Sequence, residues 1–67
     1  MGTYKIIEIV GTSQKSWEEA TREAVATAGK SLEELRIAEV VRMDVTIDGG
    51  KVKTFRVRLN VSFKLYE

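Results

Sequence analysis

Cysteine and histidine are both absent from the 67-residue sequence. Without cysteine the chain cannot form a disulfide, and without either residue it lacks the ligands of an ordinary zinc site. The same absences remove the usual nucleophile–base pairs of covalent catalysis, so we expect a protein that is not an enzyme. A chain of this length is close to the lower limit for burying a core alone. We therefore expect residues 1–67 to form a single domain that is stabilised by association with copies of itself.

A large excess of charge of one sign is also missing. Eleven Lys and Arg residues are balanced by ten Asp and Glu residues, which leaves a net charge of +1. This balance does not by itself indicate a nucleic-acid partner. No apolar run approaches the roughly 20 residues of a membrane span, and the N-terminus has no signal-peptide pattern. We expect a cytoplasmic protein without a membrane partner.

The most regular pattern present is an alternation of apolar and polar residues near the C-terminus. Apolar side chains occupy every second position from Phe55 to Leu65. This predicts one continuous strand over 52–66 with an apolar and a polar face. Such a strand is about 45–50 Å long, whereas a compact chain of this length has a radius of gyration of only about 11 Å. The strand is longer than the globule, which again predicts that other copies of the chain cover its ends.

A shorter strand and a helix precede this pattern. Residues 4–10 are rich in β-branched side chains and predict a first strand, which the small residues 11–13 end. Ser16 and Glu19 fit a capping box, which predicts a helix over 17–28 followed by a glycine stop. Much of the helix's apolar stripe is small, so its backbone can lie very close to the sheet.

The middle of the chain completes the fold. Residues 31–35 predict one further helical turn, and residues 36–47 predict a second long strand. The Asp-Gly-Gly-Lys segment at 48–51 then predicts a tight hairpin. The expected fold class is α+β in the order β-α-β-β, with a three-stranded antiparallel sheet and one helix packed across one face.

Two single residues stand out in these elements. Trp17 is the first residue of the helix's apolar stripe, which predicts a core anchor rather than a ligand-stacking ring. Glu39 shares the alternation of the apolar Val41 and Met43. We therefore expect Glu39 to form an ion pair with an arginine, or else to lie near a subunit boundary.

Basic residues gather on the polar face of the last two predicted strands. Arg56, Arg58 and Lys64 share one side of the final strand, and Arg42 and Asp44 share one side of the strand before it. One interpretation is a solvated face with cross-strand ion pairs, each worth little. The other is a basic surface that faces an internal cavity or an anionic ligand. The residues alone leave both open.

The succession of these segments resembles the dodecin family. The resemblance rests on Gly-Thr-Ser at 11–13 after a strand, a capped alanine-rich helix, Ala-Glu-Val at 38–40 in a long strand, and the closing Val-Ser-Phe-Lys-Leu at 61–65. It covers nearly the whole chain. It implies a β-α-β-β subunit whose long sheet wraps around one helix, and twelve copies arranged as a hollow homododecamer.

The resemblance also implies a ligand. Flavin-binding dodecins stack the flavin rings against a Trp of the second long strand and contact the polar ring edge with a Gln of the last strand. Counted from the matching segments, these cofactor-binding positions are Ile37 and Arg56 here. Isoleucine offers less stacking surface than indole, and arginine cannot accept a hydrogen bond. Arg56 would instead favour an anionic ligand.

The expected function is a non-enzymatic protein that binds or stores a small ligand. A flavin (FMN or riboflavin), or else an anionic cofactor, is the first candidate. The alternative is a flavin-free dodecamer that is purely structural or binds calcium, as the resemblance implies for the branch without the Trp, with Glu39 and Asp44 as candidate carboxylates. A more distant alternative is a nucleic-acid-binding module that uses the basic sheet face, with Tyr66 as its stacking aromatic.

Overall fold

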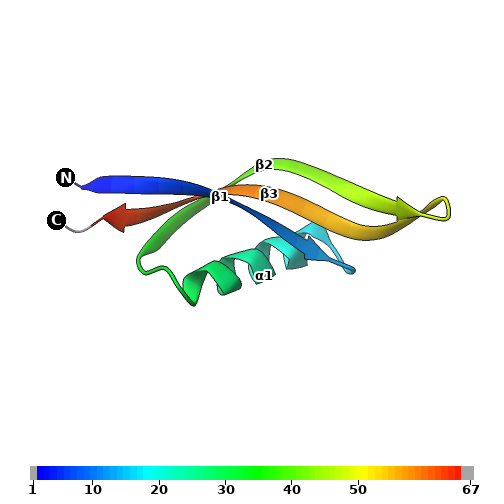
Figure 1. The fold of residues 1–67 in the computed structure, drawn as a ribbon, viewed down its shortest axis with the longest axis horizontal. Helices are drawn as coiled ribbons and strands as arrows, with labels where there is room; N and C mark the ends of the chain where they lie inside the picture. The colour runs from blue at the N-terminus through cyan, green and yellow to red at the C-terminus, as the bar shows by residue number, and fades with distance from the viewer. Residues whose placement is uncertain (1, 66–67) are drawn as a thin grey trace.

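The computed structural model describes residues 2–65, which form three strands and one helix (Figure 1). Their order along the chain is β1 (Thr3–Ser13), α1 (Trp17–Gly29), β2 (Leu35–Asp48) and β3 (Lys51–Leu65). Both β1 and β2 pair antiparallel with β3, so β3 is the central strand of the sheet. The helix lies across one face of this sheet. The predicted α+β fold with the order β-α-β-β is therefore confirmed.

The core lies between α1 and the central strand. Its buried residues are the alternate apolar positions Val57, Leu59 and Val61 of β3, together with Ala20 and Ala24 of α1. Alanine projects little from a helix, so the helix backbone approaches the sheet closely. The alternation near the C-terminus thus identified the buried face of β3 correctly.

Gly11 shows how close the helix and the sheet lie. A Cβ atom added there would be 2.3 Å from the carbonyl oxygen of Ala20 and 2.7 Å from the Cβ of Ala24. The prediction that residues 11–13 end the first strand is wrong, because β1 continues through them to Ser13. Glycine serves here to admit the helix, and it does not break the strand.

The segment between α1 and β2 is the second correction. Residues 31–35 do not form the predicted helical turn; the amide of Leu32 donates to Ala28 O at 3.0 Å and closes the end of α1. Glu34 then adopts a left-handed conformation with φ of 60°, and its carbonyl accepts from the Lys64 amide at 3.2 Å. Pairing with β3 therefore overrides the local helix signal, and β2 begins at Leu35.

The cap and the hairpin follow their local signals. The Ser16 hydroxyl accepts from the Glu19 amide at 3.0 Å, while the Glu19 carboxylate binds Arg22 and so does not complete the capping box. Gly49 and Gly50 have φ angles of 60° and 76°. Two successive positive φ angles are those of a tight type I′ hairpin turn.

The molecule is unusually long for its mass. It extends over 51 × 20 × 13 Å with a radius of gyration of 13.7 Å, against about 11 Å for a compact chain of this length. Its accessible surface is 5204 Å², whereas a compact monomer of this mass exposes about 4,200 Å². The β2–β3 hairpin and the outer ends of β1 and β3 project beyond α1 (Figure 1). The strands are therefore longer than the helix that covers them. Within residues 2–65, no helix has the length and apolar character needed to cross a membrane.

Candidate functional site on the open face of the sheet

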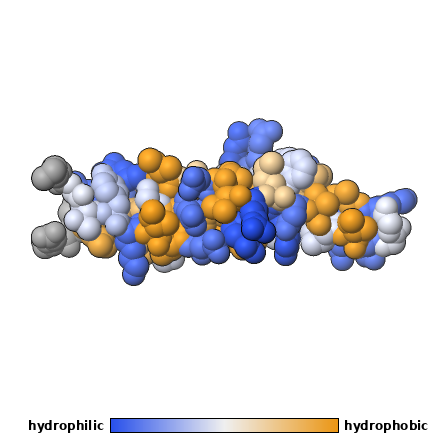
Figure 2. All heavy atoms as spheres, turned by 90° about the horizontal axis from the view of Figure 1, so that it is seen from above, coloured by the Kyte–Doolittle hydropathy of each residue, from blue (hydrophilic) through white to orange (hydrophobic). Residues whose placement is uncertain are grey.

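The face of the sheet opposite α1, called the open face below, collects the candidate residues. Directly paired residues of an antiparallel sheet point to the same side, so the strand register assigns each side chain to a face. Four successive rows on the open face each take one residue from β1, β3 and β2. From the hairpin toward the termini, these rows are Thr12–Arg56–Asp44, Val10–Arg58–Arg42, Glu8–Asn60–Glu39 and Ile6–Ser62–Ile37. Figure 2 shows hydrophobic and hydrophilic surface alternating along the long axis of the molecule.

An irregularity in β2 decides which of its residues reach the open face. The pairing with β3 shifts between Val40 and Arg42, so Val41 is an extra residue in the strand. Because a bulge adds one residue to the strand, the residues after it point to the side opposite to the one that simple alternation predicts. Glu39 and Arg42 consequently lie on the open face, while Val40 and Met43 face the helix side. The prediction that Glu39 shares a face with Met43 is wrong for this reason.

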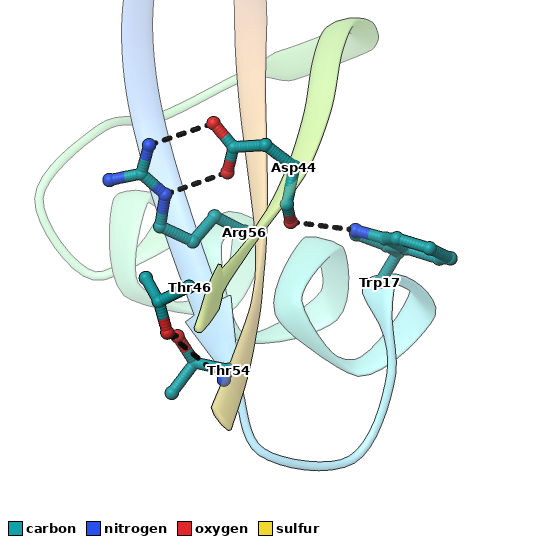
Figure 3. A network of polar contacts seen from close by, with 5 residues as sticks. All are labelled: Trp17, Asp44, Thr46, Thr54 and Arg56. Carbon is teal, nitrogen blue, oxygen red and sulfur yellow. Dashed lines mark hydrogen bonds and ion pairs between the residues drawn. The ribbon is translucent and has the colours of Figure 1, made fainter. Parts of the chain in front are cut away.

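Asp44 and Arg56 form the best-defined contact of the open face. The guanidinium of Arg56 donates from Nε and from one terminal nitrogen to the two carboxylate oxygens of Asp44, both at 2.7 Å (Figure 3). The hydrogen bond from Arg56 holds the pKa of Asp44 below its usual value, and the nearby charges of Arg56 and Arg58 add to this. The same contact raises the pKa of Arg56. A cross-strand ion pair, which was one of the two interpretations of this face, is therefore present, and it occupies the residue that the resemblance assigned to a cofactor.

Trp17 connects this row to the helix. Its indole N–H donates to the backbone carbonyl of Asp44 at 3.0 Å, so the residue that binds Arg56 with its side chain also holds the start of α1 (Figure 3). The ring contacts Phe55 edge to face, with centroids 5.1 Å apart. Trp17 is nevertheless 37% exposed and lies outside the buried cluster. The expectation of a core anchor is wrong in that respect, because the ring packs against Phe55, which is itself only partly buried.

The two residues implied for flavin binding do not meet within one chain. Ile37 lies in the row of Ser62, is 68% exposed, and has its carbonyl bonded by the Ser62 hydroxyl. Arg56 is six positions from Ser62 along β3, which places the two rows about 20 Å apart. Any single site that contains both side chains must therefore combine two copies of the chain.

The candidate metal carboxylates also lie apart. Glu39 occupies a row with Asn60 and Glu8, whereas Asp44 lies two rows away and is bound to Arg56. Within residues 2–65, Glu39 forms no ion pair, so the expected arginine partner is not found there. The same part of the chain holds no group of three or more Asp or Glu residues arranged to bind a metal.

The sequence indicated that the last two strands contribute to this face, but the contribution of β1 was not predicted. Ile6, Glu8 and Val10 all lie on the open face. The only signal was the alternation within residues 4–10, which carries β-branched residues on both faces and so does not say which face meets the helix. Tyr66, the aromatic of the nucleic-acid alternative, lies outside the described residues.

Comparisons with known proteins agree over almost the whole chain. The family model described as Dodecin matches residues 3–66. Calcium dodecin of Mycobacterium tuberculosis is 45% identical over 65 residues, which cover 97% of this chain and 92% of that protein. Dodecin of Thermus thermophilus is 42% identical over 64 residues, covering 96% and 93%.

Solved structures show the same fold. Dodecin from Streptomyces coelicolor superposes with a TM-score of 0.94 at 36% identity, covering 98% of this chain and 94% of that one. The crystal structure of the Mycobacterium tuberculosis protein, described as calcium-chelating with a novel calcium-binding site, has a TM-score of 0.85 at 46% identity and covers 96% and 91%. With sequence and fold in agreement over this length, the chain belongs to the dodecin family.

Proposed function

We propose that the protein is a non-enzymatic binding and storage protein, which assembles into a hollow homododecamer and holds a small ligand against the open face of its sheet. The observation that supports assembly is the amount of apolar surface that the chain leaves uncovered. Large apolar side chains at least 40% exposed are Tyr4, Ile6, Val10, Ile37, Val40, Val41, Met43, Ile47, Val52 and Leu65. Exposed apolar surface on this scale marks an interaction site.

The assembly is tested by native mass spectrometry. Twelve subunits of 7.5 kDa give a particle of about 90 kDa, which is the expected result. A monomer or a dimer at micromolar concentration would contradict the shell.

Calcium is the ligand that the open face supports best. The row of Glu8, Asn60 and Glu39 places two carboxylates and an amide oxygen across the three strands, and its residues form no ion pair within residues 2–65. Hard cations such as calcium take six to eight oxygen ligands. One row supplies part of such a set, and the row of a second copy across a symmetry axis would supply more. The relative named calcium dodecin adds to this support.

Flavin is the second candidate, and one specific observation supports it. Ile6 and Ile37, which are 64% and 68% exposed, flank Ser62 in one row and offer apolar surface on which a planar ring can lie. The order given by the sequence alone, flavin before calcium, is reversed because the guanidinium of Arg56 is bound by Asp44. An arginine held in this way is a poorer partner for an anionic cofactor.

The deciding experiment is calorimetric titration of calcium into chelator-treated protein, with the variants Glu8→Gln and Glu39→Gln. Each variant removes one charged ligand and keeps the shape of the side chain, so we expect calcium affinity to decrease about tenfold or more, which corresponds to ~1.4 kcal/mol. The matched control is Glu33→Gln, an exposed glutamate in the connection before β2, which should bind as the unaltered protein does.

Two outcomes would contradict this proposal. One is the absence of calcium binding at millimolar concentration, and the other is binding that neither open-face variant changes. A parallel titration of FMN and riboflavin, followed by quenching of flavin fluorescence at micromolar protein, separates the two ligands. Quenching together with absent calcium binding would restore flavin as the first candidate.

A further inference from the structure

The row next to the proposed calcium ligands carries two arginines that oppose each other. Arg42 of β2 and Arg58 of β3 are direct partners in the register, with Val10 beside them on β1. Side chains in such positions have Cβ atoms only about 5 Å apart, and like charges placed there destabilise the strand pair. Both residues are exposed, and within residues 2–65 neither forms an ion pair or a side-chain hydrogen bond. The fold therefore keeps two opposed positive charges without a direct ion pair to either of them within the described residues.

The acidic groups around this pair offset its repulsion only in part, through the longer-range attraction between Arg58 and Asp44. Asp44, one row toward the hairpin, has both carboxylate oxygens bound by Arg56. Glu8 and Glu39 lie one row toward the termini and form no ion pair with either arginine. A row with two arginines is thus adjacent to a row with two glutamates. The arginine row attracts anions, and the glutamate row attracts cations.

A small cleft lies at the arginine row. It has a volume of about 80 Å³ and is lined by Val10, Arg42, Asp44, Arg56, Val57 and Arg58. This space suits a small tetrahedral oxyanion. Guanidinium groups bind phosphate oxygens through two parallel hydrogen bonds, and forks from two neighbouring strands can approach one anion from two sides.

We propose that Arg42 and Arg58 form a binding site for a tetrahedral oxyanion of the phosphate class. Such an anion turns the repulsion between the two guanidinium groups into two attractions, which explains why opposed arginines are tolerated here. The site is distinct from the calcium ligands and does not depend on them. Because it is exposed, we expect millimolar to submillimolar affinity that weakens as salt increases.

The test is a titration with inorganic phosphate at low ionic strength, in the presence of a calcium chelator, followed by the ³¹P chemical shift and by the melting temperature. We expect Arg42→Gln and Arg58→Gln each to weaken phosphate binding about tenfold, because each removes one of two charged forks. The Arg58→Lys variant keeps the positive charge and loses the paired hydrogen-bond geometry of the guanidinium group. Its phosphate affinity should therefore lie between the affinities of the unaltered protein and of Arg58→Gln. The matched control is Arg22→Gln on α1, which removes one positive charge away from the open face and should bind phosphate normally.

Stability provides a second readout that does not need tight binding. Without phosphate, Arg42→Gln should melt at or above the temperature of the unaltered protein, because the variant removes the repulsion. With phosphate, the melting temperature of the unaltered protein should increase more than that of the variant. Since the chelator removes calcium, failure here leaves the calcium proposal intact, and failure of calcium binding leaves this one intact.

Two results would overturn the inference. The first is an equal phosphate response in the unaltered protein, Arg42→Gln and Arg22→Gln, which would indicate nonspecific screening. The second is dissociation of the assembly in Arg58→Gln without measurable phosphate binding by the unaltered protein. That result would mean that carboxylates of a neighbouring copy, rather than a free oxyanion, neutralise the arginine row.

Discussion

On the face that α1 covers, Leu59 is fully buried and Val57 and Val61 are 1% exposed, whereas on the open face Ile37 remains 68% exposed. The same three strands build both faces. The covered face is apolar at its centre and so tightly packed that β1 needs a glycine beneath the helix. On the open face, a row with an ion pair is followed by a row with two arginines, a row with two glutamates, and a row in which two isoleucines flank a serine. The covered face therefore supplies most of the stability of the subunit, and the open face is free to carry residues that suit a ligand or another copy.

The largest loss of stability is expected for a substitution at the centre of the covered face. Leu59→Ala removes a fully buried side chain, and such truncations cost about 2–5 kcal/mol of unfolding free energy through lost burial and the cavity left behind. Ile37→Ala on the open face should cost much less. Denaturant unfolding at matched subunit concentration measures both variants, because assembly couples stability to concentration. Equal costs would mean that the open face is buried in the assembly as completely as the core.

A somewhat smaller effect is expected where the helix meets β1. Gly11→Ala places a methyl group 2.3 Å from the Ala20 carbonyl oxygen, so α1 must move, at a cost of about 1–3 kcal/mol. Gly29→Ala is the matched control, because its nearest neighbour would be Leu35 Cδ1 at 3.8 Å. Thermal melts should show a large decrease for the first variant and little change for the second. A neutral Gly11→Ala would show that the helix is not as close to the sheet as described.

The affinity of the open face for flavin can be tested by placing an aromatic ring on it. Ile37→Trp adds the stacking surface that the family resemblance associates with flavin, and aromatic contacts of this kind are worth about 0.5–1.5 kcal/mol beyond buried area. We therefore expect FMN affinity to increase by up to about tenfold, measured by fluorescence quenching. Ile47→Trp is the control, since Ile47 is also 68% exposed but lies beside the hairpin turn. Equal gains in both variants would indicate nonspecific stacking.

The smallest expected effect is a loss of stability at acidic pH. Arg56 lowers the pKa of Asp44 from its usual value of 3.8. A carboxyl whose pKa is lower in the folded state adds stability above the unfolded pKa and loses it as the pH decreases through the folded value. The contribution should therefore be present at pH 5 and above and disappear in the acid range below about 4. Because the pair is exposed, the change should be small.

Trp17 is the natural reporter of this transition. It is the only tryptophan of the chain, and its indole donates to the Asp44 carbonyl. Its fluorescence should change in the acid range in the unaltered protein and change less in Asp44→Asn. Asp48→Asn, which alters an exposed aspartate near the hairpin, is the control and should retain the full change. An identical acid response in Asp44→Asn would assign the titration to another group.

Much of the fold could be read from local patterns. The alternation from Phe55 to Leu65 identified the buried side of β3, and Ser16 identified the start of α1. The two glycines of the hairpin adopt the positive φ angles that their position indicated. These signals are reliable because side-chain periodicity, helix capping and turn geometry depend on residues close together in the chain.

The open face was harder to predict. The basic residues of β2 and β3 were recognised, but their partners on β1 were not, and the ion pair between Asp44 and Arg56 emerged only from the register. A single sequence does not specify which residues stand opposite one another on two strands. The choice between a ligand residue and an ion-pair residue at Arg56 depends on that information.

The sequence by itself determined the elements, their order and the side of the central strand that is buried. The tertiary structure decided three matters that depend on distant residues. The bulge at Val41 moved Glu39 to the open face, and the approach of α1 made Gly11 a packing position. The bond from Lys64 to Glu34 replaced a helical turn with an irregular connection that leads into β2. In each case a contact between segments far apart in the chain outweighed a local preference, because local propensities are worth only a fraction of what strand pairing and close packing contribute together.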